Sequence, residues 1–299
     1  MSEMTVRGAY MRASSFLVAR GVEDHVASVE WLLQHVLGVT RTRLLTQWSE
    51  PMDEDQHAKL WELINRRALG EPVQYITGET YFYGRKYLVN RSVLIPRPET
   101  ELLVERILAT SDKLWEPESS LTIVDVGTGS GVIAISLALE RSHWKIIATD
   151  ISVPALNVAK QNAIRHQVSE RIQFIERDLL VVRNEAPDEE SIGAIEKMDI
   201  LVSNPPYIRS RDLPDLQREV RNYEPHLALD GGEEGLDLYD GLIKQFRQQS
   251  VWPRFIALEV GLGQAQQVEK LLRETGKWDH YEIIPDLAGV ERNVFAWKE

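Results

Sequence analysis

The chain contains no cysteine among its 299 residues. Disulfide bonds, catalysis by a thiolate and metal sites built on cysteine are therefore excluded. No stretch reaches the roughly eighteen consecutive apolar residues that a membrane-spanning helix requires. Residues 1–20 also lack the apolar core and cleavage site of a secretory signal peptide. We therefore expect a cytoplasmic protein that does not span a membrane.

An excess of positive charge is also missing. The chain has 34 Lys and Arg against 46 Asp and Glu, which gives a formal net charge of -12 at pH 7. Extended electrostatic binding to the phosphate backbone of nucleic acid requires clustered Lys and Arg. The charge therefore argues against direct nucleic-acid binding and favours a protein partner or a small substrate.

The N-terminal part, residues 1–75, is predicted to be a small helical domain. Residues 22–37 carry apolar side chains at helical spacing and are followed by Gly38. Residues 53–69 repeat this pattern and are followed by Gly70, and glycine commonly ends a helix. Residues 1–72 hold 8 Lys and Arg against 10 Asp and Glu, so no basic helix is available for a nucleic-acid groove. A domain of this kind suits contact with a protein partner.

A linker is predicted between this helical domain and a larger one. Pro72 interrupts the helical pattern. Residues 81–89 are rich in aromatic and β-branched residues around a glycine, which predicts a short β-hairpin. We therefore place the linker at residues 76–98 and the larger domain at residues 99–299.

The larger domain alternates predicted strands and helices. The seven predicted strands are residues 121–126, 145–150, 172–175, 198–203, 255–260, 281–285 and 293–297. Almost nothing separates the last two strands, so they should pair antiparallel. Alternation of this kind predicts an α/β fold with a mainly parallel, Rossmann-like sheet covered by helices on both faces. Residues 184–197 are expected to form a solvated insertion.

A glycine-rich segment follows the first strand and opens a helix. Glycine lets the backbone turn tightly and approach a ligand, and a helix N-terminus adds partial positive charge. The spacing differs from the dinucleotide fingerprint, because Val132 stands where the third glycine belongs, and no P-loop lysine follows. The candidate ligand-binding residues of this segment are Asp125, Gly127, Thr128, Gly129, Ser130 and Gly131.

Two acidic residues follow at the ends of the next strands. Asp150 ends the second strand, where a carboxylate can accept the hydroxyls of a ribose. Asp178 comes just past the third strand and could accept an adenine amino group, while Leu179 could cover the ring. Open parallel sheets bind ligands at the carboxyl ends of their strands. The three features together predict an adenosyl ligand.

The segment Asn204-Pro-Pro-Tyr directly follows the fourth strand. Pro205 and Pro206 restrain the backbone and donate no N–H, so the segment offers the Asn204 side-chain oxygen and backbone carbonyls as acceptors. Tyr207 could supply a flat wall. This suits a planar NH2 group held for in-line methyl transfer, because two acceptors orient its nitrogen and favour the positive charge that develops there. No metal is needed.

Beyond these two motifs, nearly the whole chain resembles the release-factor glutamine methyltransferase family of the HemK/PrmC type. The further segments that carry the resemblance are GEPVQYITG at 70–78, LIPRPETE at 94–101, YEPHLALDGG at 223–232, EVGLGQ at 259–264 and DLAGVER at 286–292. Members of this family are class I methyltransferases that use S-adenosylmethionine. They methylate the side-chain nitrogen (N5) of a glutamine, that of the GGQ motif, in class-1 peptide release factors.

The resemblance implies roles for particular residues. Residues 127–131, Asp150 and Asn204 would contact the cofactor, and residues 204–207 would hold the glutamine amide. The helical domain would help to dock the release factor. Leu179 stands where the family often has an aromatic residue, which implies weaker stacking on adenine.

Three other functions stay open on the sequence. A glutamine methyltransferase of the same kind could act on a ribosomal protein, and its discriminator would lie in the helical domain. A nucleic-acid amino-group methyltransferase, of the N6-adenine type, would need a basic face that the charge does not supply. A non-catalytic adenosyl-binding module would bind cofactor without transferring a methyl group.

Overall fold

The computed structural model describes residues 4–182, 195, 197–248 and 251–299. It divides into two compact units: Met1–Glu79 with Gln217–Tyr223, and Thr80–Leu216 with Glu224–Glu299. The predicted insertion at 184–197 lies almost wholly outside the described residues. Across the described part of the chain, no helix has the length and apolar character needed to cross a membrane.

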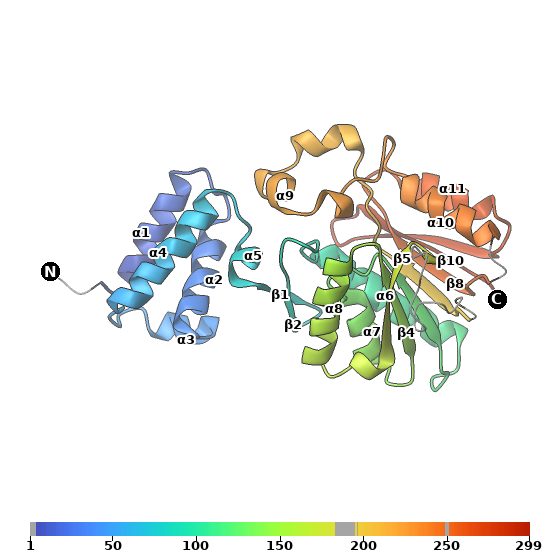
Figure 1. The fold of residues 1–299 in the computed structure, drawn as a ribbon, viewed down its shortest axis with the longest axis horizontal. Helices are drawn as coiled ribbons and strands as arrows, with labels where there is room; N and C mark the ends of the chain where they lie inside the picture. The colour runs from blue at the N-terminus through green and yellow to red at the C-terminus, as the bar shows by residue number, and fades with distance from the viewer. Residues whose placement is uncertain (1–3, 183–194, 196, 249–250) are drawn as a thin grey trace. The chain divides into compact units, whose positions relative to one another are not determined.

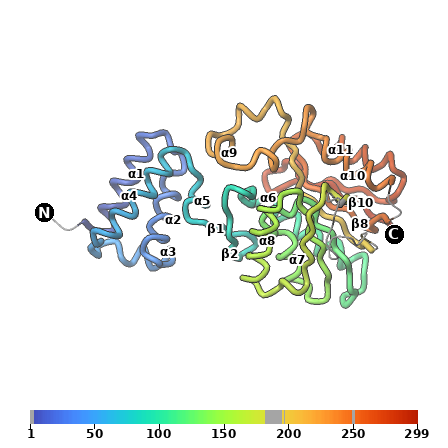
Figure 2. Tube along the Cα trace, viewed as in Figure 1, coloured from blue at the N-terminus to red at the C-terminus, as the bar shows by residue number. Residues whose placement is uncertain are grey.

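The first unit is built from short helices, which can be followed along the trace in Figures 1 and 2. They are α1 (Val6–Val18), α2 (His25–Leu37), α3 (Arg41–Thr46), α4 (Glu54–Ala68), α5 (Val73–Thr77) and α9 (Arg218–Tyr223). Helix α4 starts at a capping box, in which Asp53 and Gln56 exchange side-chain to backbone hydrogen bonds. Gly38 ends α2 in the left-handed conformation. The two helices predicted in this region are therefore confirmed.

A buried arginine ties residues 217–223 to the first unit. The side chain of Arg67 donates to Asp24 Oδ1 at 2.5 Å and to Ser28 Oγ at 2.9 Å. Its other terminal nitrogen lies 2.7 Å from Glu219 Oε2. A guanidinium with 4% exposure is costly unless it is paired in this way. The sequence contained no local signal for this pairing.

The hairpin predicted between the two domains is present, as β1 (Glu79–Phe82) and β2 (Arg85–Leu88). The side chain of Asn162, wholly buried on α8 (Val153–Arg165), accepts from Leu88 N at 2.7 Å and donates to Leu88 O at 3.0 Å. It also donates to Ser130 O at 2.9 Å. One amide therefore connects the end of the hairpin to the glycine-rich segment.

The second unit contains a sheet with the strand order β6-β5-β4-β3-β7-β8-β10-β9. Its strands are β3 (Thr122–Val126), β4 (Lys145–Asp150), β5 (Ile172–Asp178), β6 (Val181–Val182), β7 (Ile200–Ser203), β8 (Phe255–Glu259), β9 (His280–Pro285) and β10 (Glu291–Trp297). The five strands β3, β4, β5, β7 and β8 run parallel. The seven predicted strands are confirmed, and so is the antiparallel pairing of the last two. The two-residue edge strand β6 was not predicted.

Helices cover both faces of this sheet (Figure 1). On one face lie α6 (Pro98–Leu114), α7 (Val132–Glu140) and α8, and on the other lie α10 (Asp237–Gln248) and α11 (Ala265–Arg273). Alternate side chains of a strand point to opposite faces. Ile123 accordingly packs into the hydrophobic core between the sheet and α6, α7 and α8, the first core. Val124 packs into the core between the sheet and α10 and α11, the second core. Short 3-10 turns at η1 (Ser169–Arg171), η2 (Ser210–Asp215) and η3 (His226–Ala228) complete the described elements.

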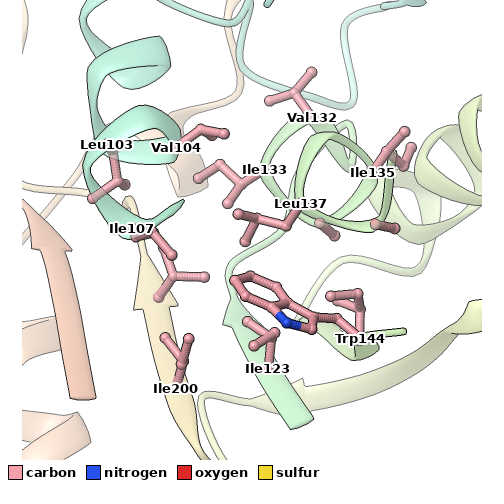
Figure 3. Close-up of a cluster of buried hydrophobic side chains, with 14 of the residues drawn as sticks. Leu103, Val104, Ile107, Ile123, Val132, Ile133, Ile135, Leu137, Trp144 and Ile200 are labelled. Carbon is pink, nitrogen blue, oxygen red and sulfur yellow. The ribbon is translucent and has the colours of Figure 1, made fainter. Parts of the chain in front are cut away.

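Figure 3 shows how the first core joins two helices to the sheet. Side chains from α6, α7 and two neighbouring strands converge there with one tryptophan: Leu103, Ile107, Ile133, Leu137, Ile123, Ile200 and Trp144. All are almost fully buried. Burial of this kind contributes roughly 1.5–3 kcal/mol per large side chain. It holds the first turns of α6 and α7 in place beside the carboxyl ends of β3 and β7.

Candidate active site

The glycine-rich segment forms a tight turn between β3 and α7. Gly127 N and Thr128 N both donate to Thr149 O at 2.9 Å, which ties the turn to the neighbouring strand. Gly131 precedes α7 with a φ of 83° and caps its N-terminus. The turn therefore presents backbone at the carboxyl ends of β3 and β4, as predicted.

Gly131 is required at its position for two separate reasons. Its φ is in the left-handed region, and a Cβ there would lie 3.0 Å from Ile135 Cδ1 and 3.1 Å from Ala159 Cβ. We expect Gly131→Ala to lower the free energy of unfolding by about 2 kcal/mol, from backbone strain and crowding together. Gly129→Ala is the matched control, because Gly129 also has a positive φ but open space around the added carbon. It should cost about 1 kcal/mol. Equal losses in urea denaturation would contradict the crowding contribution.

Asp150 is held by the turn that it faces. Its Oδ2 accepts from Gly129 N and its Oδ1 accepts from Ser152 N, both at 2.9 Å. Burial raises the pKa of this carboxyl, and the backbone N–H donors oppose that shift. Both oxygens keep lone pairs for a ligand. The carboxylate is thus fixed in orientation at the end of β4.

Asp125 lies behind the turn, wholly buried. Its Oδ2 accepts from Thr128 Oγ1 at 2.6 Å, and no described residue hydrogen-bonds to Oδ1. Burial raises the pKa of this carboxyl to about 7. Of the two, Thr128 lines the cavity described below, whereas Asp125 is not among the described lining residues. Asp125 therefore supports the turn from behind, and direct contact with a cofactor stays a prediction.

The corner after β5 has an unusual backbone. Leu179 has a φ of 60°, a left-handed conformation that is uncommon for a leucine. Thr149 Oγ1 donates to Leu179 O at 3.2 Å. Gln245, from α10, accepts from Leu180 N at 2.8 Å and donates to Asp178 O at 3.0 Å. These bonds hold the Leu179 backbone in place where the residue lines the cavity.

One continuous cavity runs along the carboxyl ends of β3, β4, β5 and β7. The predicted site residues that line it are Gly127, Thr128, Gly129, Ser130, Asp150, Asp178, Leu179, Asn204, Pro205 and Pro206. It is also lined by residues from two other segments, among them Arg97 and Thr100, and Pro225 and Leu227. The predicted nucleotide end and the predicted acceptor end therefore belong to the same cavity.

The backbone around Pro206 and Tyr207 is clamped by a neighbouring segment. Ile208 N donates to Leu229 O at 3.0 Å, and Gly231 N donates to Ile208 O at 2.8 Å. A Cβ on Gly231 would lie only 2.7 Å from Pro206 O, so the two backbones touch. This close packing keeps the prolines at one position relative to the sheet.

The ring of Tyr207 packs beside the cavity, where it contacts the second core. A Cβ on Gly261 would lie 3.0 Å from Tyr207 Cδ2, and Gln264 Nε2 donates to Tyr207 O at 2.9 Å. Burial raises the pKa of the phenol to about 12. Tyr207 is not among the described residues that line the cavity. A flat wall supplied by Tyr207 to the substrate therefore stays a prediction.

A buried carboxylate joins two further segments at the acceptor end. Glu224 Oε1 accepts from the Arg97 guanidinium at 2.7 Å, and its Oε2 accepts from Ile95 N at 3.2 Å. Glu224 is 4% exposed, and the pairing satisfies its charge. The bridge fixes Arg97 at the edge of the cavity.

Several of these residues had no predicted role. Arg97, Thr100 and Glu224 lie in segments that carried the family resemblance. The sequence therefore indicated that these segments matter, but it assigned no role to these three residues. Gln245 lies on an ordinary amphipathic helix and had no signal at all. Their contribution depends on contacts between segments far apart in the chain.

The fold and the cavity define a class I methyltransferase. The chain has an open, mainly parallel sheet with a cavity at the carboxyl ends of its strands, where sheets of this kind bind ligands, and an Asn-Pro-Pro-Tyr segment directly after β7. It matches the family model of the methyltransferase small domain over residues 98–231 and that of the PrmC N-terminal domain over residues 9–78. The catalytic domain of hMettl16, solved in complex with a MAT2A 3'UTR hairpin, shares the fold at a TM-score of 0.52 and 16% identity, with 82% of each chain covered.

Curated relatives extend over the full length. The chain is 37% identical to a release factor glutamine methyltransferase of Bacillus cereus, which covers 99% of this chain and 100% of that protein. It is 38% identical to one of Bacillus subtilis, over 98% and 97%, and 40% identical to one of Moorella thermoacetica, over 99% of each. The chain belongs to the release factor glutamine methyltransferase family, which confirms the resemblance seen in the sequence.

Proposed function

We propose that this protein transfers a methyl group from S-adenosylmethionine to the N5 nitrogen of a glutamine, that of the GGQ motif in a class-1 peptide release factor. The observation that carries the proposal is the single cavity that joins Asp150 to Asn204. Such a reaction needs the donor and the acceptor nitrogen side by side, so that attack on the methyl carbon is in line.

Support for the cofactor comes from the nucleotide end. Asp150 is oriented by two backbone N–H groups and has lone pairs left for the two hydroxyls of a ribose. Asp178 and Leu179 line the cavity at the next strand end, where an adenine base would follow the ribose. S-adenosylmethionine would supply the electrophilic methyl group on its sulfonium. The residues at this end bind and orient it.

Support for a glutamine amide comes from the acceptor end. Pro205 and Pro206 offer no backbone N–H, so the backbone of the cavity wall beside Asn204 presents only hydrogen-bond acceptors at these two residues. The lone pair of an amide nitrogen is delocalised into its carbonyl. Acceptors on both protons favour the positive charge that develops as the new N–C bond forms and the S–C bond of the sulfonium breaks, with a neutral thioether as the leaving group. One amide proton is then released to solvent. Asn204 and a backbone carbonyl of this segment are the proposed acceptors.

The names of the relatives and the charge of the chain support a protein substrate. A net charge of -12 opposes contact with phosphate backbones. We assign docking of the release factor to the first unit, and we place the activity in the cytoplasm, where translation ends. A glutamine of a ribosomal protein is the alternative acceptor.

Incubation with radiolabelled S-adenosylmethionine tests the proposal. Purified class-1 release factor, a ribosomal protein mixture and DNA would be offered in parallel. We expect label on the release factor alone, and none on a release factor whose GGQ glutamine is changed to alanine. Label only on a ribosomal protein or on DNA would contradict the proposed substrate.

A further inference from the structure

A chain of buried hydrogen bonds lies behind the Asn204 side chain. Asn204 Nδ2 donates to Thr100 Oγ1 at 3.2 Å, and Thr100 Oγ1 donates to Glu259 Oε2 at 2.7 Å. Thr100 is in the first turn of α6, and Glu259 is the last residue of β8, the strand next to β7. Their exposures are 3% and 2%, so solvent does not compete for these bonds.

In this series of hydrogen bonds, which group donates to which decides which way the Asn204 amide faces. We call this sequence of donors and acceptors the donor order. An ionised carboxylate can only accept, so Glu259 takes the single proton of the Thr100 hydroxyl. The Thr100 oxygen is then left as an acceptor. Only the NH2 end of the Asn204 amide can satisfy it, and Asn204 also contributes a side-chain hydrogen bond that favours ionised Glu259. The Oδ1 atom of Asn204 is thereby left for the cavity.

We propose that Glu259, acting through Thr100, is a positioning residue that makes Asn204 present its oxygen, and not its NH2, to the substrate. The proposal rests on the proposed function, in which Asn204 accepts a proton of the glutamine amide. An amide has nearly the same shape in its two flipped orientations. Without a fixed donor order behind it, Asn204 would present NH2 to NH2 for part of the time, and that orientation repels the substrate.

A structural role alone does not explain a carboxylate at position 259. Burial raises the pKa of Glu259 to about 7, so the folded state disfavours its ionised form. Because this pKa lies above the unfolded value, the carboxyl reduces stability as the pH rises from about 4.5 through 7. A neutral glutamine would avoid that cost. Stability near neutral pH therefore gives no reason for a carboxylate at this position.

The groups around Glu259 set its titration near neutral pH. Arg292 on β10 and the hydrogen bonds from Thr100 and Asn204 lower its pKa, while Glu99 on α6 raises it. Burial is larger than all of these. Tyr207, in the segment after β7, interacts electrostatically with Glu259, and Tyr239 on α10 donates to Glu259 O at 2.7 Å. Both phenols stay neutral at these pH values, since their pKa values are raised.

Protonation of Glu259 removes the donor order. A protonated carboxyl has an O–H that it can give to Thr100, whose own proton is then free for Asn204 Oδ1. The Asn204 amide can then turn its NH2 towards the substrate. We therefore expect kcat of the wild-type enzyme to fall as the pH is lowered through about 7.

Three variants test the inference: Glu259→Gln, Thr100→Val and Thr100→Ser. Each is assayed for kcat with purified release factor from pH 6 to 9, for S-adenosylmethionine affinity by calorimetry and for unfolding in urea. Glu259→Gln and Thr100→Val should each lower kcat, by up to about 100-fold, the loss seen when one oriented polar group is removed completely. Thr100→Ser keeps the hydroxyl and should stay within a few-fold of wild type. The remaining activity of Glu259→Gln should not vary with pH across 7, and its stability at pH 8 should be no lower than that of wild type.

Two results would overturn the inference. One is wild-type kcat and an unchanged pH profile in Glu259→Gln, and the other is equal loss in Thr100→Ser and Thr100→Val. Thr100→Val gives an independent answer if Glu259→Gln does not fold. Asn204→Ala, assayed in parallel, distinguishes the acceptor role of Asn204 from its positioning by Glu259. If Asn204→Ala is impaired while Glu259→Gln is normal, only this inference fails; if neither is impaired, the acceptor assignment fails with it.

Discussion

Replacing Asn204 with alanine is expected to lower kcat for methyl transfer by about 100- to 1,000-fold. The side chain stands at the acceptor end of the cavity, directly after β7, with its NH2 held by Thr100. Without its oxygen, the glutamine nitrogen loses one of the two acceptors that orient it and that favour the developing charge. The loss should appear in kcat because the interaction strengthens in the transition state.

Affinity for S-adenosylmethionine separates this effect from general damage. We expect it to stay within a few-fold in Asn204→Ala, because Asp150 and the glycine turn at the other end of the cavity are unchanged. The exposed Asn157 on α8 provides a matched control, and Asn157→Ala should leave both quantities unchanged. Equal turnover by Asn204→Ala and wild type would refute the acceptor assignment.

The second large effect is expected on cofactor binding. Asp150→Ala should weaken the affinity for S-adenosylmethionine by about 100-fold or more, since each hydrogen bond to a charged group contributes roughly 1.5–3 kcal/mol. The substitution removes both acceptors from the ribose position. It also leaves Gly129 N and Ser152 N without the carboxylate that now orients the turn.

Isothermal calorimetry with S-adenosylmethionine measures this loss directly. Asp112→Ala is the control, because Asp112 is exposed on α6 and pairs with Arg141 on the protein surface. It should bind cofactor like wild type. Unfolding curves for both variants would show that the protein is folded. An unchanged affinity in Asp150→Ala would mean that this carboxylate does not bind the ribose.

The parts of the molecule that could be predicted from the sequence are those governed by local patterns. Helix α7 (Val132–Glu140) begins directly after the glycine-rich segment, as predicted. The strands around it are short apolar segments, and burial on both faces gives such segments a clear signal. The segment at 204–207 was recognisable because two prolines restrict its backbone whatever surrounds it.

The parts that could not be predicted depend on contacts between distant residues. Glu259 lies 159 positions from Thr100, and nothing near either residue in sequence shows that they meet. Arg67 and Glu219 are separated in the same way. The left-handed backbone at Leu179 is held by Gln245 through its neighbours, although leucine itself disfavours it. Tyr207 packs onto the second core because Gly261 leaves room for its ring.

The position of the transferred methyl group tests the central claim most directly. Purified class-1 release factor would be incubated with S-adenosylmethionine and either the wild-type enzyme or Asn204→Ala, digested, and mapped by tandem mass spectrometry. We predict one methyl group on the side-chain amide of the GGQ glutamine, with its rate of appearance strongly reduced by Asn204→Ala. A methyl group on any other residue, or the same rate with both enzymes, would contradict it.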